Sequence, residues 1–180
     1  MRSRPLYKPL LKWLAAAILS LPATSAVAVD ETGRAGVIDG DTIEIHGTRF
    51  RLWGIDAPES NQLCRDADAA HYRCGAKAAN SLHDFISGLI VNCVEVDRDR
   101  YRRSVSVCSV GSVDLADWMV RQGLALDWPQ YSQRAYAEAQ QEAQRHKRGI
   151  WQGSFAEPWR YRTCLRQPGK RPATCSDEAG

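Results

Sequence analysis

Acidic and arginine side chains gather in residues 36–59, which read GVIDGDTIEIHGTRFRLWGIDAPE. Asp41, Asp56 and Glu59 supply carboxylates there, and Arg51 supplies a planar, permanently charged guanidinium group. Hard cations are bound by carboxylate and carbonyl oxygens, and phosphate by the forked donors of arginine. The mixture therefore predicts metal-assisted chemistry on a phosphate group.

Three strand-like runs position these side chains. Residues 32–38 form a weak first strand, and Asp39-Gly40 has the composition of a tight turn. Residues 42–46 alternate apolar and polar side chains, as expected of a half-buried strand. Residues 49–55 alternate in the same way, so Arg51 projects from the face opposite the apolar one. A meander of three strands is predicted.

The rest of the chain predicts helices, a second hairpin and an irregular end. Residues 61–74 read as a polar loop, a candidate substrate-facing flap. The later elements are a helix over 75–87, strands over 90–96 and 104–110, a helix over 112–122, a helix capped by Ser132 with Ala135, Ala139 and Ala143 on one stripe, and an irregular tail from Ile150. This order predicts an α+β fold with a small sheet that could close into a barrel.

The second hairpin has a predicted register. An apolar face forms when two valines of each strand pair, Val94 with Val107 and Val96 with Val105. The same register places Cys93 directly opposite Cys108, at a separation that a disulfide tolerates.

The first residues predict an export signal. Four basic residues precede an apolar run over 13–21, and Ala26-Val27-Ala28 resembles a cleavage site. Cleavage after Ala28 is expected. An uncleaved membrane anchor is the alternative, but the apolar run is shorter than the ~20 residues that span a bilayer. The expected division is a signal peptide over 1–28, a domain over 29–151 and a tail over 152–180. We expect a monomer in the periplasm or secreted, without stable membrane association.

Six cysteines in an exported chain indicate an oxidising compartment and disulfide bonds. Six cysteines allow fifteen complete pairings, and only the middle pair has a geometric argument. The sequential pairing is preferred: Cys64 with Cys74, Cys93 with Cys108 and Cys164 with Cys175. No zinc-finger spacing is present.

The net charge does not by itself indicate nucleic-acid binding. The chain has 24 Lys and Arg and 21 Asp and Glu residues, and four of the basic ones lie before residue 29. The remainder therefore carries 20 minus 21, or −1. A phosphate-binding field has to be local, and the densest basic cluster is Arg98, Arg100, Arg102 and Arg103.

An ordered set of motifs resembles the staphylococcal nuclease (thermonuclease) family over about residues 36–151. The motifs are Asp39-Gly40-Asp41-Thr42, Phe50-Arg51-Leu52 with Asp56-Ala57-Pro58-Glu59, Asp99-Arg100-Tyr101-Arg102-Arg103, Val120-Arg121-Gln122-Gly123-Leu124-Ala125 and Gly149-Ile150-Trp151. The resemblance implies a five-stranded OB-type β-barrel with three helices that hydrolyses phosphodiester bonds in DNA and RNA with one Ca²⁺.

The resemblance also implies roles for individual residues. Asp41, Asp56 and the backbone carbonyl of Ala57 would bind Ca²⁺. Glu59 would be the general base that activates water, and Arg51 and Arg103 would bind the phosphate. The family commonly has glycine at the position of Arg102. If the backbone there needs a positive φ, a non-glycine residue costs about 1 kcal/mol. Arg103 keeps the family spacing from Tyr101.

Aromatic side chains offer surfaces on which bases could stack. Tyr101, Trp128 and Tyr131 are the candidates, with Arg100 as a further substrate contact, although Trp128 and Tyr131 could equally pack at the barrel rim. No base-edge code is evident, so little sequence specificity and single-stranded or locally melted substrates are expected. The alternatives are a catalytically inactive OB-fold module that binds nucleic acid or protein, and a structural secreted domain.

Overall fold

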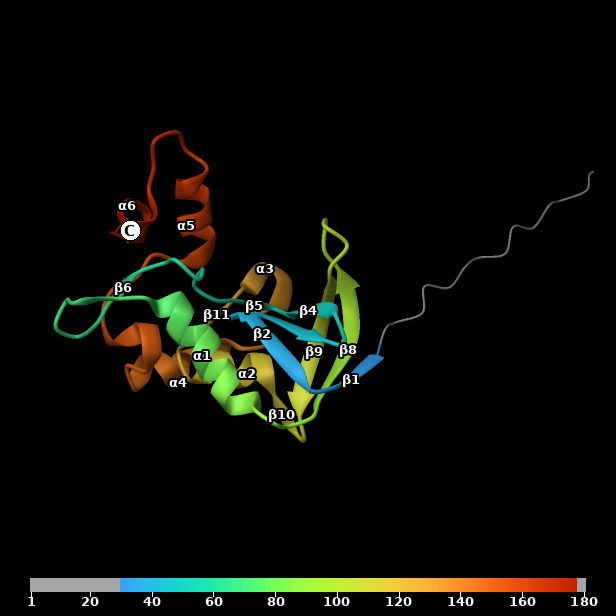
Figure 1. Cartoon of the computed structure of the whole chain (residues 1–180). Helices are drawn as coiled ribbons and strands as arrows, with labels where there is room; N and C mark the ends of the chain where they lie inside the picture. Colours follow the sequence, from blue (N-terminus) through green and yellow to red (C-terminus); the bar gives the residue numbers. More distant parts are fainter. Residues whose placement is uncertain (1–29, 178–180) are drawn as a thin grey trace, which may run out of the picture.

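The computed structural model describes residues 30–177, so the expected signal peptide over 1–28 lies outside the described residues. The main sheet contains β1 (Asp30–Gly33), β2 (Ala35–Asp39), β3 (Thr42–Ile45), β4 (Thr48–Leu52), β8 (Val91–Arg98), β9 (Ser104–Val110) and β10 (Val113–Asp114). The strand order is β1-β8-β9-β4-β3-β2, with β10 paired to β9. Only β4 and β9 pair in parallel within this described sheet. The sheet curls as a half-barrel (Figure 1), which confirms an OB-type α+β fold.

Two short strand pairs flank the main sheet. β5 (Ile55–Asp56) pairs with β11 (Leu126–Asp127), and β6 (Cys64–Arg65) pairs with β7 (His71–Tyr72). The first pair fixes the segment that follows β4. The second forms within the stretch expected to be a polar loop, and the backbone N–H of Arg65 donates to the carbonyl of Ser154. That stretch is therefore held against the C-terminal part of the chain.

The barrel core follows the period-two pattern of the strands. Ile43 and Ile45 of β3 and Phe50 and Leu52 of β4 are all at most 1% exposed. Helix α1 (Cys74–Ile86) covers this core with one apolar stripe, which includes Ala78, Leu82 and Ile86. Helix α2 (Leu115–Arg121) is capped by Asp114, whose carboxylate accepts from the backbone N–H groups of Ala116 and Asp117.

The β8–β9 hairpin confirms part of the expected register. Cys93 lies opposite Cys108 and Val94 opposite Val107. The pairing of Val96 with Val105 is wrong, because the register shifts between Glu95 and Asp97 and places Asp97 opposite Val105. One extra residue in a strand resets all later pairs. The cysteine face is buried in the core, whereas Val94 and Val96 are exposed.

The helix expected to follow Ser132 begins only at Ala137, and Ser132 is instead the last residue of a separate short helix. Helix α3 (Pro129–Ser132) ends where Gln133 and Arg134 take positive φ values of 53° and 69°, and α4 (Ala137–Arg145) begins after them. Residues with positive φ cannot continue a right-handed helix. Two alanines of the expected stripe, Ala139 and Ala143, are buried, but Ala135 is exposed.

The C-terminal segment is helical, which corrects the expectation of an irregular tail. It forms the 3₁₀ helix η1 (Gly149–Gln152), α5 (Pro158–Leu165) and α6 (Pro172–Asp177). Proline suits the first turn of a helix, because its missing N–H would have no partner there. Helices α5 and α6 lie together on the side of the barrel where β6 lies (Figure 1).

All three preferred disulfides are present: Cys64–Cys74, Cys93–Cys108 and Cys164–Cys175. The first joins β6 to α1, the second joins β8 to β9, and the third joins α5 to α6. None of the helices over residues 30–177 is both long enough and apolar enough to cross a membrane.

Candidate active site

A small cavity is lined by most of the residues predicted to act in catalysis or cation binding. Its volume is about 80 Å³. It is lined by Asp39, Gly40, Asp41, Arg51, Ala57, Pro58, Glu59 and Arg103. These residues come from the β2–β3 turn, β4, the segment after β5 and the end of the β8–β9 hairpin. The fold therefore brings the distant Arg103 to the residues of the 36–59 stretch.

Arg51 bridges two carboxylates beside this cavity. Its Nη2 donates to Oδ2 of Asp41 at 2.9 Å and to Oδ1 of Asp56 at 3.2 Å. The backbone also fixes the site, because the N–H of Leu52 donates to the carbonyl of Asp41 at 2.8 Å. Asp56 itself is held in β5 opposite Leu126. A positively charged nitrogen thus lies between the two predicted metal ligands.

Burial perturbs the acids around this bridge. Asp56 is fully buried, and burial raises its pKa to about 6, although hydrogen bonds from Arg162 and the charges of Arg162 and Arg51 lower it. Burial and the nearby charge of Asp41 likewise raise the pKa of Asp39 to about 6. Both groups are still mainly ionised at neutral pH. The site therefore holds ionised carboxylates that are partly desolvated and paired with arginine.

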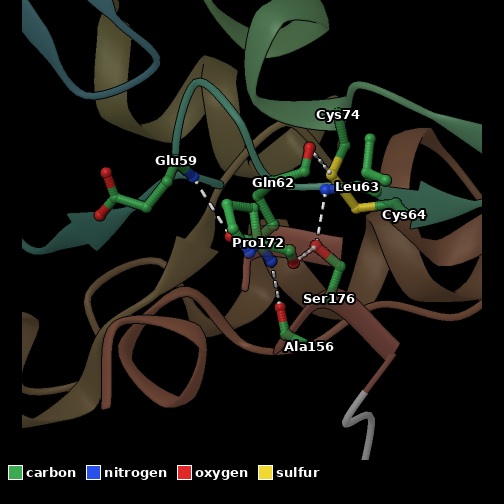
Figure 2. The surroundings of a disulfide bond; sticks show 8 residues. All are labelled: Glu59, Gln62, Leu63, Cys64, Cys74, Ala156, Pro172 and Ser176. Carbon is green, nitrogen blue, oxygen red and sulfur yellow. Dashed lines mark hydrogen bonds between the residues drawn. A yellow bond between two sulfur atoms is a disulfide. The ribbon is translucent and has the colours of Figure 1, made fainter. Parts of the chain in front are cut away.

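Glu59 is held by its backbone while its carboxylate stays accessible. Its N–H donates to Oε1 of Gln62 at 3.2 Å, and its carbonyl accepts from the N–H of Gln62 at 2.8 Å. Gly75 at the start of α1 packs against this loop so closely that a Cβ there would lie 1.8 Å from the Glu59 carbonyl oxygen. Figure 2 shows the Glu59 carboxylate pointing away from Gln62 and the disulfide.

The β8–β9 turn settles which backbone position needs a positive φ. Arg102 has a φ of 64°, as the glycine common at this position in the family suggested, and its side chain is exposed. Asp99 holds the neighbouring Arg103, because its Oδ2 accepts from Nε of Arg103 at 2.7 Å and its Oδ1 from the Arg103 backbone N–H. Of these two arginines, Arg103 lines the cavity.

One residue of the site was missed from the sequence. Arg162 of α5 donates from Nη1 to Oδ1 of Asp56 and to Oε1 of Glu59, both at 2.9 Å, and from Nη2 to Oδ2 of Asp56 at 2.7 Å. Burial alone would lower the pKa of Arg162, but its hydrogen bonds to the two carboxylates and their charges raise it. The C-terminal segment therefore takes part in the site.

The predicted stacking residues divide into two groups. Trp128 lies beside the carboxylates, with the guanidinium carbons of Arg51 and Arg162 at 5.8 and 5.5 Å from its ring centroid. Tyr131 makes an edge contact with Trp128. Tyr101 lies on the β8–β9 turn, two-thirds exposed, with the guanidinium groups of Arg100 and Arg103 near its ring. None of Arg100, Tyr101, Trp128 and Tyr131 lines the small cavity.

Comparison with known proteins gives the family. The family model described as staphylococcal nuclease homologue matches residues 49–153. The chain belongs to this family. The match includes Arg51, Asp56, Glu59 and Arg103, whereas Asp41 precedes it and Arg162 follows it.

Individual relatives of the staphylococcal nuclease family carry different names. The succinoglycan biosynthesis protein ExoI of Rhizobium meliloti is 41% identical over 140 residues, which are 77% of this chain and 72% of that protein. A probable staphylococcal-like nuclease, CAN1, of Oryza sativa subsp. japonica is 31% identical over 68% of this chain and 35% of its own length. An uncharacterized endonuclease of Haemophilus influenzae is 31% identical over 64% of this chain and 62% of its own length. The family supports nuclease action on nucleic acid in general.

The candidate donors for a hard cation are two carboxylates and a backbone carbonyl. Within residues 30–177, no three His, Cys, Asp or Glu side chains are grouped so that they could hold a metal ion. The two carboxylates that share Nη2 of Arg51 do converge on one positive group, and Ala57 lies beside them in the cavity wall. Oxygen ligands of this kind suit Ca²⁺, which accepts irregular geometry and completes its shell with water.

Proposed function

We propose that this protein is an exported, Ca²⁺-dependent nuclease that hydrolyses phosphodiester bonds in DNA and RNA with little sequence specificity. The observation that carries the proposal is the convergence on one cavity of Asp41, Arg51, Glu59 and Arg103, with Asp56 bound to Arg51 directly beside it. These residues come from separated parts of the chain and have the types that the chemistry needs.

The cation site would be made of oxygen atoms. Asp41, Asp56 and the backbone carbonyl of Ala57 would hold Ca²⁺. When bound, the ion supplies charge that polarises the phosphoryl group and offsets charge developing on it. The burial of Asp56 strengthens its attraction for a cation, because water screens a buried charge poorly.

The protein groups divide the remaining work. Glu59 would take a proton from the attacking water. The water oxygen bonds to phosphorus while the bond between phosphorus and the leaving oxygen breaks. Arg51 and Arg103 would each donate two parallel N–H bonds to phosphate oxygens, a fork that lysine cannot reproduce. Asp99 supports this role, because it orients Arg103 through both its backbone N–H and Nε.

The aromatic residues would bind nucleotides on both sides of the cavity. Tyr101 is exposed beside Arg100 and Arg103, and Trp128 with Tyr131 lies near Arg51. Base stacking on such rings tolerates every base and needs unstacked nucleotides. Single-stranded or locally melted DNA and RNA are therefore the expected substrates.

Disulfides support an extracytoplasmic location. All the cysteines within residues 30–177 are paired, which is typical of an oxidising compartment. We propose that the mature protein is a monomer, periplasmic or secreted, without stable membrane association.

A second candidate is a non-catalytic OB-fold module that binds nucleic acid or protein. The name of the Rhizobium relative, which refers to succinoglycan biosynthesis rather than to nucleic acid, favours it. The complete set of acids and arginines favours the nuclease, because a binding module needs neither a base nor a cation site.

Digestion of single-stranded DNA, duplex DNA and RNA by the purified, oxidised protein distinguishes the two candidates. We expect cleavage with Ca²⁺ that a chelator abolishes, fastest on single strands. Glu44→Gln is the matched control for a lost carboxylate, because Glu44 pairs with Arg49 on the surface, and it should leave the rate unchanged. Binding to single strands without any Ca²⁺-dependent cleavage would favour the non-catalytic module.

A further inference from the structure

Helix α5 contributes a guanidinium group that the family motifs do not include. Arg162 makes three charge-assisted hydrogen bonds of 2.7 to 2.9 Å, two with Asp56 and one with Glu59. Both acceptors belong to the proposed machinery, one as cation ligand and one as base. Arg162 therefore contacts two members of the site directly, although it lies outside the family match.

The surroundings of Arg162 resemble those of Arg51. Both guanidinium groups donate to Oδ1 of Asp56, and both lie within 6 Å of the ring centroid of Trp128. Both side chains are largely buried, 20% exposed for Arg51 and 25% for Arg162. A group so similar to a proposed phosphate ligand in position and partners is a candidate for the same role.

Hydrogen bonds and a disulfide hold the helix that carries Arg162 in place. Tyr161 is fully buried beside it and donates from its hydroxyl to Oδ1 of Asn61 at 2.9 Å. Figure 2 shows two further ties between this segment and the loop after Glu59: Nε2 of Gln62 donates to the carbonyl of Ala156, and the N–H of Leu63 donates to Oγ of Ser176. The Cys164–Cys175 disulfide joins α5 to α6. Arg162 is thus anchored to the same loop that carries Glu59.

The hydrogen bonds of Asp56 conflict with cation binding. A carboxylate offers about four lone-pair positions, and arginine N–H groups fill three of them on Asp56. A cation bound to Asp56 would need the same oxygens, so arginine N–H groups would have to give up their hydrogen bonds to this carboxylate. Arg162 would then keep Glu59 but need a new acceptor for its second nitrogen, and a phosphate oxygen is the partner that suits a guanidinium fork.

We propose that Arg162 is a third phosphate-binding arginine of this nuclease, which occupies Asp56 until the cation binds and then transfers its free N–H donors to the substrate phosphate. The proposal rests on the proposed function and adds a residue from the C-terminal segment to it. It predicts two effects of opposite sign: loss of Arg162 strengthens cation binding in the free protein and weakens substrate binding.

The test uses the full, oxidised protein with Arg162→Gln, and Arg160→Gln as the matched control. Arg160 lies on the same helix but is mainly exposed and pairs with Glu157. Calorimetric titration with Ca²⁺ alone should show about tenfold tighter binding by Arg162→Gln, because a charge-assisted competitor is removed. With Ca²⁺ present, binding of a single-stranded oligonucleotide with non-hydrolysable linkages should weaken at least about tenfold. Arg160→Gln should change neither.

Each other result overturns the proposal in a defined way. Unchanged Ca²⁺ affinity would show that Arg162 does not share Asp56 with the cation. Tighter Ca²⁺ binding with unchanged oligonucleotide affinity would make Arg162 only a counter-ion. If Arg162→Gln does not fold, Arg162→Lys replaces it. The ammonium group of lysine is a point charge without the fork of arginine, so this variant should bind the oligonucleotide more weakly than wild type. Wild-type protein that binds Ca²⁺ but cleaves nothing would instead refute the proposed function.

Discussion

The site has two halves that are held in place by different means. In the barrel half, Asp41, Arg51 and Asp56 come from strands and a tight turn whose other face is the main core. In the C-terminal half, Arg162 comes from a helix with a small apolar cluster of its own, in which Tyr161 packs with one disulfide. The barrel half is thus fixed by the cooperative folding of the domain. The other half depends on one crosslink and a few long-range hydrogen bonds.

This difference assigns different tasks to the two halves. The proposed cation ligands, which need exact placement, lie on the barrel, and the proposed base Glu59 lies on the loop that directly follows β5. The proposed role of Arg162 in the C-terminal half is to bind the phosphate. Changes in the barrel half should therefore abolish chemistry, whereas changes in the C-terminal half should alter substrate and cation affinity.

The largest effect is expected for Glu59→Gln. Loss of a general base lowers turnover by about 10²- to 10⁴-fold. Calcium affinity should change little, because Glu59 is not a proposed ligand. Single-turnover cleavage and calorimetric Ca²⁺ titration measure the two quantities. A rate within a few-fold of wild type would remove Glu59 from the base role and weaken the distinction between the halves.

Removing one disulfide from each half allows the two halves to be compared directly. Replacing Cys164 and Cys175 by Ser should loosen α5, raise KM for single strands and leave barrel unfolding nearly unchanged. Replacing Cys93 and Cys108 should lower the free energy of unfolding by about 2 to 5 kcal/mol with little change in KM. Thermal unfolding and steady-state kinetics check both pairs of changes. Equal effects on KM would contradict the division of tasks.

The Cys64–Cys74 disulfide belongs to the junction between the halves, because its hairpin contacts Ser154. Replacing both cysteines by Ser should alter KM more than replacing Cys93 and Cys108 does. The same kinetic assay decides this, and an identical KM in the two double variants would refute it.

Calcium affinity should depend on pH in the weakly acidic range. Burial raises the pKa of Asp56 and of Asp39 to about 6, so both carboxylates are free of protons above that pH and compete with protons below it. Affinity should therefore be full at about pH 7.5 and should fall by about tenfold per pH unit below about pH 6, because a proton on the proposed ligand Asp56 competes with the cation. Protonation of the neighbouring Asp39 should weaken binding further by removing a negative charge. Calorimetry over this range tests the prediction, and Asp39→Asn separates the contribution of Asp39. A constant affinity down to about pH 5 would refute it.

The smallest effect is expected on the β8–β9 turn. Arg102→Gly should stabilise the protein by about 1 kcal/mol, because glycine accepts the φ of 64° without strain. The melting temperature should rise by about 2 to 4 °C. Arg102 lies outside the cavity, so cleavage should not change. A lower melting temperature would show that the Arg102 side chain stabilises the turn.

Local patterns allowed much of the barrel half to be predicted. Alternation placed Arg51 opposite the buried Phe50 and Leu52, and the order of the family motifs grouped it with Asp41 and Arg103. Opposed valines and cysteines predicted the register of the second hairpin near Cys93. Side-chain period and turn composition are short-range properties, so the sequence carries them directly.

The features that the sequence did not predict depend on long-range contacts or on the backbone dihedrals of single residues. The shift after Glu95 and the helix break at Gln133 each depend on one or two residues with no compositional signal. Arg162 pairs with a carboxylate that is 106 residues earlier in the chain, and its helix has no spacing motif beyond a starting proline. Only the folded chain reveals that pairing.

Calcium titration of cleavage by wild type and Asp41→Asn, side by side on a labelled single-stranded oligonucleotide, tests the central claim most directly. The wild-type protein should show saturable, Ca²⁺-dependent cleavage. Asp41→Asn should need at least about tenfold more Ca²⁺ for half-maximal cleavage, because it loses one of two charged ligands. Cleavage that persists in chelator, or identical Ca²⁺ midpoints for the two proteins, would contradict a cation site built on Asp41 and Asp56.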